Sequence, residues 1–157
     1  MLAAKYAMPL ERASALNARV EDEASRSGMQ WSLASAQPTN TFDAHRLVAL
    51  AATQERQGAM LERLFRAYFS EGLLVSDSAI LQSLALDVGV TGAELVLAGQ
   101  EYADAVRYDE NLATKIGITG VPAFIFDGRA HVSGAQGADA MLDALHRAWA
   151  GRQEQTA

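Results

Sequence analysis

Apolar side chains recur at helical spacing along most of the chain. The strongest stripe runs through Met60, Leu61, Leu64, Phe65, Tyr68 and Phe69. Prolines, glycines and capping residues bound such stripes, because proline suits a first helical position and glycine a position just past the end. The pattern predicts helices over 10–27, 42–57, 92–98, 102–116 and 138–150, one through Met60 that Gly72 closes, and one capped by Asp77 that carries residues 80–88.

The apolar stripes also predict which side chains enter the core. In the helix over 42–57, Leu47, Leu50 and Ala51 share one face, and Gly58 is expected to end that helix. In the last two helices, the expected core contacts are Ala105, Leu112, Ala113 and Ile116, followed by Met141, Leu142, Leu145, Ala148 and Trp149.

The hydrophobic pattern changes near the C-terminus. Residues 123–126 form a continuous apolar run, Asp127-Gly128 follows, and 131–133 resume a strand-like pattern, which together predict a β-hairpin. Pro122 stands at the entrance of the first strand, where a proline removes one ladder donor. Residues 29–33 alternate apolar and polar side chains and predict a short strand or an extended linker.

Composition narrows the class of protein. The chain has 157 residues, half of them hydrophobic, which suits one globular domain, and its formal charge is −6. Its few scattered lysines and arginines predict no nucleic-acid binding. No apolar run has membrane-spanning length, and the N-terminus lacks a signal-peptide layout, so we expect a cytoplasmic protein that binds no membrane.

The sequence carries no cysteine, which excludes disulfides, thiol catalysis and cysteine-bound metals within this chain. Its three histidines are far apart, so we expect no metal site and no resident cofactor. We interpret His45 as a helix residue that packs against its surroundings, with a general base or a pH-sensitive contact as the alternative. The stripe that contains Phe65, Tyr68 and Phe69 is interpreted as core, with a hydrophobic groove as the alternative.

Three stretches and a turn, taken in order, resemble a known family. They are "NTFDAHRL" (40–47), "LFRAYFSEG" (64–72), "IGITGVPAF" (116–124) and "VSGAQ" (132–136). By these stretches, residues 2–151 resemble the DsbA-like thioredoxin-fold oxidoreductases, and the branch they resemble most is the FrnE-like one. The implied fold is α/β but mostly helical: the C-terminal half of a thioredoxin fold with a large helical insertion.

The resemblance also implies a division of the chain. We expect a mainly helical insertion subdomain over 1–116, a partial thioredoxin-like unit over 117–151 and a tail over 152–157. Family members begin with a strand, a Cys-x-x-Cys opening a long helix, and a second strand, whereas this sequence starts downstream of all three, near residues 2–7. The family activity is thiol–disulfide exchange, but we expect this chain to be a truncated, redox-inactive form without a catalytic residue.

The site that the resemblance does carry over is the turn at Gly120, Val121 and Pro122. The Val121–Pro122 bond is expected to be cis, as in the family. Backbone groups beside that bond would pair with an extended peptide or a glutathione-like ligand. The alternative is inherited backbone geometry that binds nothing.

Loss of the first strand would leave the strand over 123–126 with an unpaired apolar edge. We expect a second copy, a partner, or a segment of this chain such as 29–33 to cover that edge. Two other functions stay open: a non-enzymatic module that binds a peptide or partner, and a fragment of a glutathione-dependent isomerase or transferase.

Overall fold

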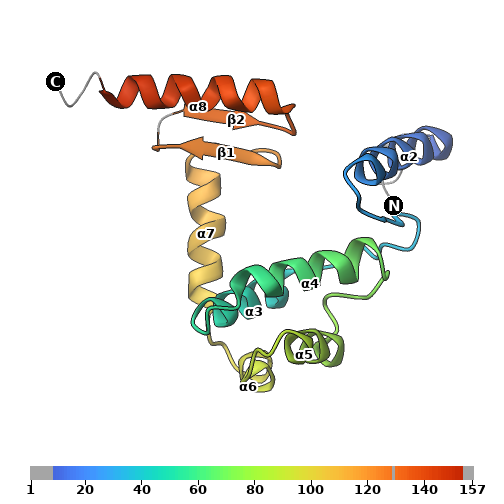
Figure 1. The fold of residues 1–157 in the computed structure, drawn as a ribbon. Coiled ribbons are helices and arrows are strands. Elements are labelled where there is room, and N and C mark those ends of the chain that lie inside the picture. Colours follow the sequence, from blue (N-terminus) through green and yellow to red (C-terminus); the bar gives the residue numbers. More distant parts are fainter. Residues whose placement is uncertain (1–8, 129, 154–157) are drawn as a thin grey trace. The chain divides into compact units, whose positions relative to one another are not determined.

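The computed structural model describes residues 9–128 and 130–153, so the expected stretch at 2–7 and the last four residues of the predicted tail lie outside the described part. The chain divides into two compact units, Met1–Arg107 and Tyr108–Ala157. This boundary lies inside the helix Ala103–Lys115, whereas the division expected from sequence, at 116–117, directly follows that helix. In order, the elements are α2 (Leu10–Arg26), α3 (Phe42–Ala52), α4 (Gln57–Phe69), α5 (Ser78–Asp87), α6 (Ala93–Ala98), α7 (Ala103–Lys115), β1 (Ala123–Phe126), β2 (Ala130–Ser133) and α8 (Ala138–Gln153) (Figure 1).

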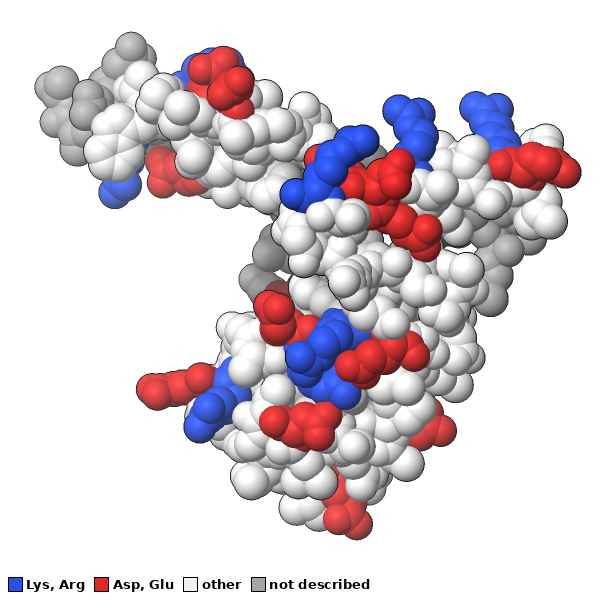
Figure 2. Space-filling model, turned by 45° about the vertical axis from the view of Figure 1, so that its right-hand side comes forward, with Lys and Arg blue, Asp and Glu red and all other residues white. Residues whose placement is uncertain are grey.

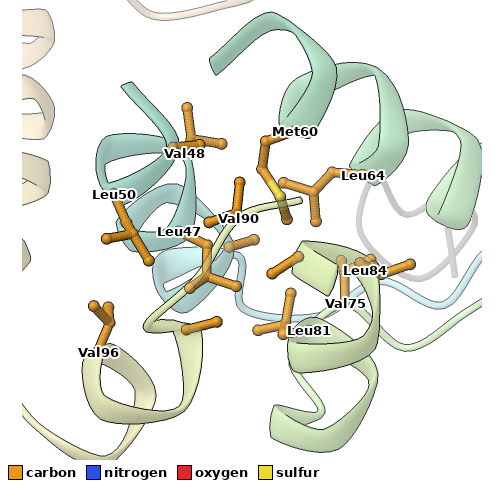
Figure 3. Close-up of a cluster of buried hydrophobic side chains, with 14 of the residues drawn as sticks. Leu47, Val48, Leu50, Met60, Leu64, Val75, Leu81, Leu84, Val90 and Val96 are labelled. Carbon is orange, nitrogen blue, oxygen red and sulfur yellow. The ribbon is translucent and has the colours of Figure 1, made fainter. Parts of the chain in front are cut away.

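The first unit is built on a hydrophobic core to which helices α3 to α6 contribute. Leu47, Met60, Leu81, Leu84 and Val90 are its largest fully buried side chains, and Figure 3 shows them gathered between these helices. Burying one such side chain contributes about 1.5–3 kcal/mol, so this cluster is the main source of stability in the first unit. The core face predicted for α3 is confirmed, since Leu47, Leu50 and Ala51 are buried. In α4 the prediction is confirmed for Met60 and Leu64 but is wrong for Phe65, which is exposed.

The end of α3 corrects one predicted boundary. The helix stops at Ala52 and not at residue 57, because Glu55 takes a left-handed backbone conformation with φ of 57°. The Arg56 N–H then donates to the Ala51 carbonyl oxygen at 2.8 Å, which closes the turn as a glycine usually would. Gly58 therefore lies in the first turn of α4 and ends no helix. Asp77 caps α5 as predicted, since its side chain accepts from the backbone N–H groups of residues 79 and 80.

Arg46 is the one buried charged side chain among the described residues, and it holds α3 against the segment 96–101. Its guanidinium donates to the carbonyl oxygens of Val96, of Gly99 at 2.9 Å and of Glu101 at 2.9 Å. It also pairs with Asp43, one turn earlier, at 2.8 Å. A buried guanidinium is tolerated here because its donors have partners.

A second arginine, Arg63, joins α4 to the end of α5. Its Nε donates to Asp87 at 2.8 Å and its Nη1 to Glu71 at 2.9 Å. Burial by itself lowers the pKa of Arg63, but the hydrogen bonds and charges of the two carboxylates raise this pKa more, so its net shift is upward. The two carboxylates therefore favour the charged form of the guanidinium.

Residues 29–33 form no strand, which corrects the first of the two expectations for this segment. The segment runs along the C-terminal end of α4: the Ser32 N–H donates to the Phe69 carbonyl oxygen at 2.7 Å, and the Trp31 ring stacks on the Phe69 ring at 4.6 Å. Its backbone and aromatic groups are thus engaged within the first unit, and β1 is paired with β2 alone among the described residues.

The second unit contains the predicted β-hairpin, followed by α8, which packs against β2 (Figure 1). The strands are antiparallel, with Phe124 opposite Val132 and Phe126 opposite Ala130. Helix α8 extends through Gln153, into the stretch expected to be a tail.

Most of the core contacts expected in α7 and α8 are wrong. Ala105, Leu112, Ile116, Leu142, Leu145 and Trp149 are all exposed. In α7 the buried residues are Ala103 and Val106, which the predicted stripe did not include. In α8 the described residues of the second unit provide no opposing layer for the predicted stripe to pack against. Ala144 is the only buried hydrophobic residue that the structure describes in this unit.

The charged surface has no large patch of one sign on the face shown in Figure 2, where acidic and basic side chains lie interspersed. None of the described helices combines the length and apolar character needed to cross a membrane.

Candidate functional site

The turn at 120–122 is positioned by the end of α7. Gly117, with φ of 77°, closes the helix: its N–H donates to the Thr114 carbonyl oxygen at 3.1 Å, and the Ile118 N–H donates to that of Ala113 at 2.9 Å. This pair of hydrogen bonds is a Schellman motif, in which a left-handed glycine satisfies the last carbonyl groups of a helix. The chain leaves α7 at a fixed point and enters β1 at Ala123, six residues after Gly117.

Residues 120–122 form an exposed turn at the start of the hairpin. The Val121–Pro122 peptide bond is cis, and the Val121 side chain is 87% exposed. The Pro122 carbonyl oxygen accepts a hydrogen bond of 2.8 Å from the Gly134 N–H, just beyond the end of β2. The turn is therefore fastened to β2 on one side. Within the described part of the chain, the backbone groups of Gly120 and Val121 make no hydrogen bond.

The register determines which backbone groups of β1 face away from β2. Pro122 and Gly134 form a hydrogen-bonded pair, and such pairs alternate with non-hydrogen-bonded pairs along an antiparallel ladder. Phe124 and Phe126 consequently direct their N–H and C=O groups toward β2. Ala123 and Ile125 direct theirs to the opposite edge, which no described residue pairs.

Apolar side chains line this unpaired edge. Phe124 is 37% exposed and Ile125 is 43% exposed. At the far end, Asp127 and Gly128 have φ of 52° and 68°, the left-handed region that tight hairpin turns use. We call the exposed turn together with the outward groups of Ala123 and Ile125 the β1 edge.

The side chains next to the β1 edge are mostly apolar. No residue from Gly117 to Phe126 has a titratable side chain. The register places His131, on β2, opposite Ile125, and its side chain is exposed. The arrangement leaves backbone donors and acceptors available to an extended chain.

The other residues singled out from the sequence lie in the first unit. His45 is exposed on α3 and lines a cavity together with Phe65, Tyr68 and Phe69. Of the three aromatic residues interpreted as core, Tyr68 packs against the core, whereas Phe65 is exposed. All three line the cavity, which was the alternative interpretation. No group of three or more metal-binding side chains occurs among the described residues.

Sequence reasoning named Gly120, Val121 and Pro122 but missed Ala123, Ile125 and Gly134. The structure brings the turn and Gly134 together across the hairpin. A signal existed in "HVSG", because a glycine directly after a strand often supplies a positive φ, and Gly134 has φ of 80°. Which amides face outward depends on the register, which the sequence pattern does not fix.

Comparison with known proteins finds a family model and similar solved structures. Residues 3–146 match the family model described as a DSBA-like thioredoxin domain. The crystal structure of a probable DsbA oxidoreductase from Streptomyces coelicolor is similar, with a TM-score of 0.90 and 38% sequence identity; the match covers 96% of this chain and 66% of that chain, slightly under two thirds of its length. No curated protein matches the chain.

Proposed function

Because this chain belongs to the family of DsbA-like thioredoxin domains, we propose that it contributes substrate recognition to thiol–disulfide exchange. The mostly helical, DsbA-like thioredoxin fold and the similar probable oxidoreductase support this assignment. We place the chain in the FrnE-like branch. The β1 edge is the part that would hold the substrate, as an extended polypeptide or a glutathione-like peptide.

The geometry of β1 is the observation that carries this proposal. Ala123 and Ile125 offer donors and acceptors at an edge with no described partner, beside the exposed turn at Val121. An extended peptide can add to such an edge as a further strand, with backbone hydrogen bonds providing affinity. Exposed Phe124 and Ile125 side chains would contact alternate side chains of the peptide.

Exchange chemistry requires a thiolate that attacks a disulfide sulfur. This sequence has no cysteine, so within the proposal the attacking thiol comes from outside these 157 residues. The chain by itself is expected to bind a disulfide-containing peptide without reducing it. An insulin-reduction assay on the pure chain tests that expectation, and turnover above the buffer rate would contradict it.

Binding at the β1 edge can be tested by replacing one outward amide. Ile125→Pro removes an outward N–H but leaves the ladder amides of Phe124 and Phe126 in place. Ile125→Thr is the matched control, because it keeps the N–H and the β-branched shape. We expect a short capped peptide of alternating valine and threonine to shift the amide resonances of 119–126 in the control, and Ile125→Pro to abolish these shifts.

Two results would contradict binding at the β1 edge. One is equal peptide affinity in the proline and threonine variants. The other is a set of shifted amides that lies outside 119–126. Titration of glutathione into the same two variants tests whether the edge binds a glutathione-like ligand. The same titration tests the alternative that this chain is part of a glutathione-dependent isomerase or transferase.

A second candidate function is a non-enzymatic module that binds a partner or a second copy through the same edge. The exposed apolar side chains of the second unit favour it, since Ala144 alone of its described hydrophobic residues is buried. Sedimentation equilibrium separates the cases. A dimer that Ile125→Pro dissociates supports self-association, whereas a monomer at every concentration contradicts it.

A further inference from the structure

The first unit contains an apolar cavity that the proposed recognition function does not use. It lies against α3 and α4 and has a volume of about 280 Å³. Ala44, His45, Leu61, Phe65, Tyr68 and Phe69 are among its lining residues. Val48, Leu64 and Val75, labelled in Figure 3, line it as well and belong to the hydrophobic core, so one wall of the cavity is formed by the core itself.

Three aromatic rings give the cavity its chemical character. Phe65 is 57% exposed although it stands on the strongest apolar stripe of the sequence, and Tyr68 and Phe69 are half-buried. The Phe65 and Phe69 ring centroids are 6.2 Å apart and tilted by 45°, and Tyr68 meets Phe69 edge-on at 4.9 Å. Rings at these distances and angles offer both faces and edges to a further aromatic group.

The polar groups of the cavity are few and carry no fixed charge. Thr39, Thr41 and the exposed His45 contribute hydroxyl and imidazole groups. No aspartate, glutamate, lysine or arginine occurs among its lining residues. An imidazole donates a hydrogen bond from whichever nitrogen carries a proton, so it favours a ligand with an acceptor or anionic group. A cationic ligand would find no carboxylate to pair with.

The volume sets the size of the ligand. A cavity of about 150 Å³ lined by aliphatic and aromatic side chains holds one benzene molecule. A cavity of about 280 Å³ is therefore large enough for two fused rings. We propose that this cavity is a binding site for a small bicyclic aromatic molecule with one carboxylate or hydroxyl group, its rings against Phe65, Tyr68 and Phe69 and its polar group at His45.

Trp31 provides a reporter for this site. Its ring stacks on Phe69 at 4.6 Å with an angle of 17° between the planes, and Phe69 lines the cavity. The chain has two tryptophans, so Trp149→Phe leaves Trp31 as the only source of an indole N–H resonance. A ligand that enters the cavity should shift that resonance saturably.

The experiment titrates the Trp149→Phe chain with 2-naphthoate, with 2-naphthol and with 2-naphthylmethylammonium. We expect saturable shifts with 2-naphthoate and 2-naphthol. The Kd of the ammonium compound should be about tenfold higher than that of 2-naphthoate, because it cannot accept a charge-assisted hydrogen bond from His45. His45→Leu should weaken 2-naphthoate by a similar factor and change 2-naphthol less. These differences would be absent if the rings bound to any exposed apolar surface.

Substitutions that fill the cavity complete the test. Thr41→Phe and Ala44→Leu each add bulk at a lining position and should abolish the Trp31 shift. Ala52→Leu, exposed on the same helix and outside the lining, is the matched control and should leave Kd unchanged. Three results would each overturn the proposal. The first is an unchanged Kd in both filling variants, and the second is an equal Kd for the three compounds. The third is the absence of a saturable shift, which would mean that a second copy or another protein segment occupies the cavity.

Discussion

The Gly134 N–H donates a hydrogen bond of 2.8 Å to the carbonyl oxygen of Pro122. This contact joins the exposed turn to the residue that follows β2, and it fixes which amides of β1 face the unpaired edge. The position of the proposed recognition site therefore depends on a glycine fourteen residues beyond Gly120 in the sequence.

Replacing Gly134 by alanine should loosen the hairpin. Its φ of 80° is a conformation that costs an L-residue about 1–2 kcal/mol, although an added Cβ would meet no atom closer than 3.8 Å. Amide exchange at Phe124 and Val132 should become faster by a factor of about 5–30. Gly137→Ala, where neither the backbone nor the space opposes a side chain, is the control and should leave these rates unchanged. Equal rates in the two variants would show that Gly134 does not fasten the turn.

Removing the buried guanidinium of Arg46 should destabilise the helical unit strongly. Arg46→Met leaves the carbonyl groups of residues 96, 99 and 101 without their donor, so we expect a loss of about 3–5 kcal/mol in the free energy of unfolding. Arg26→Met removes an exposed ion pair and should cost at most about 1 kcal/mol. Urea unfolding followed by circular dichroism measures both. A loss below 1 kcal/mol for Arg46→Met would contradict its structural role.

The core of the first unit gives a second stability prediction, with its control on the same helix. Leu81 is fully buried in α5 and Leu86 is 71% exposed. Leu81→Ala should lower the free energy of unfolding by about 2–5 kcal/mol, because it removes buried methyl groups and leaves a cavity. Leu86→Ala should change it by less than about 0.5 kcal/mol. Equal effects would mean that α5 packs with a different face.

Sequence reasoning succeeded where one local signal decides the structure. Asp77 marks the start of α5, because its side chain accepts hydrogen bonds from N–H groups two and three residues later. The Asp127-Gly128 pair marks the hairpin turn, because both residues take the positive φ that such turns need. It failed at the end of α3, where Glu55 takes the left-handed conformation that the pattern assigned to no residue. Arg46 was also missed as a buried group, because its acceptors lie 50–55 residues away.

Burial in α7 and α8 could not be predicted for a different reason. Periodicity identifies an apolar stripe but not the layer that covers it, and Leu142, Leu145 and Trp149 have no such layer among the described residues. The turn at 120–122 was found because its motif is local and specific, whereas the outward direction of the Ala123 and Ile125 amides required the strand register.

The most direct test of the recognition proposal is hydrogen exchange at four consecutive amides of β1, with and without the cysteine-free valine–threonine peptide. We predict that the peptide slows exchange at Ala123 and Ile125, whose N–H groups face the free edge, and leaves exchange at Phe124 and Phe126 nearly unchanged, because β2 already binds them. Protection of all four amides to the same degree, or of none, would contradict the assignment of the β1 edge as the site that binds an extended chain.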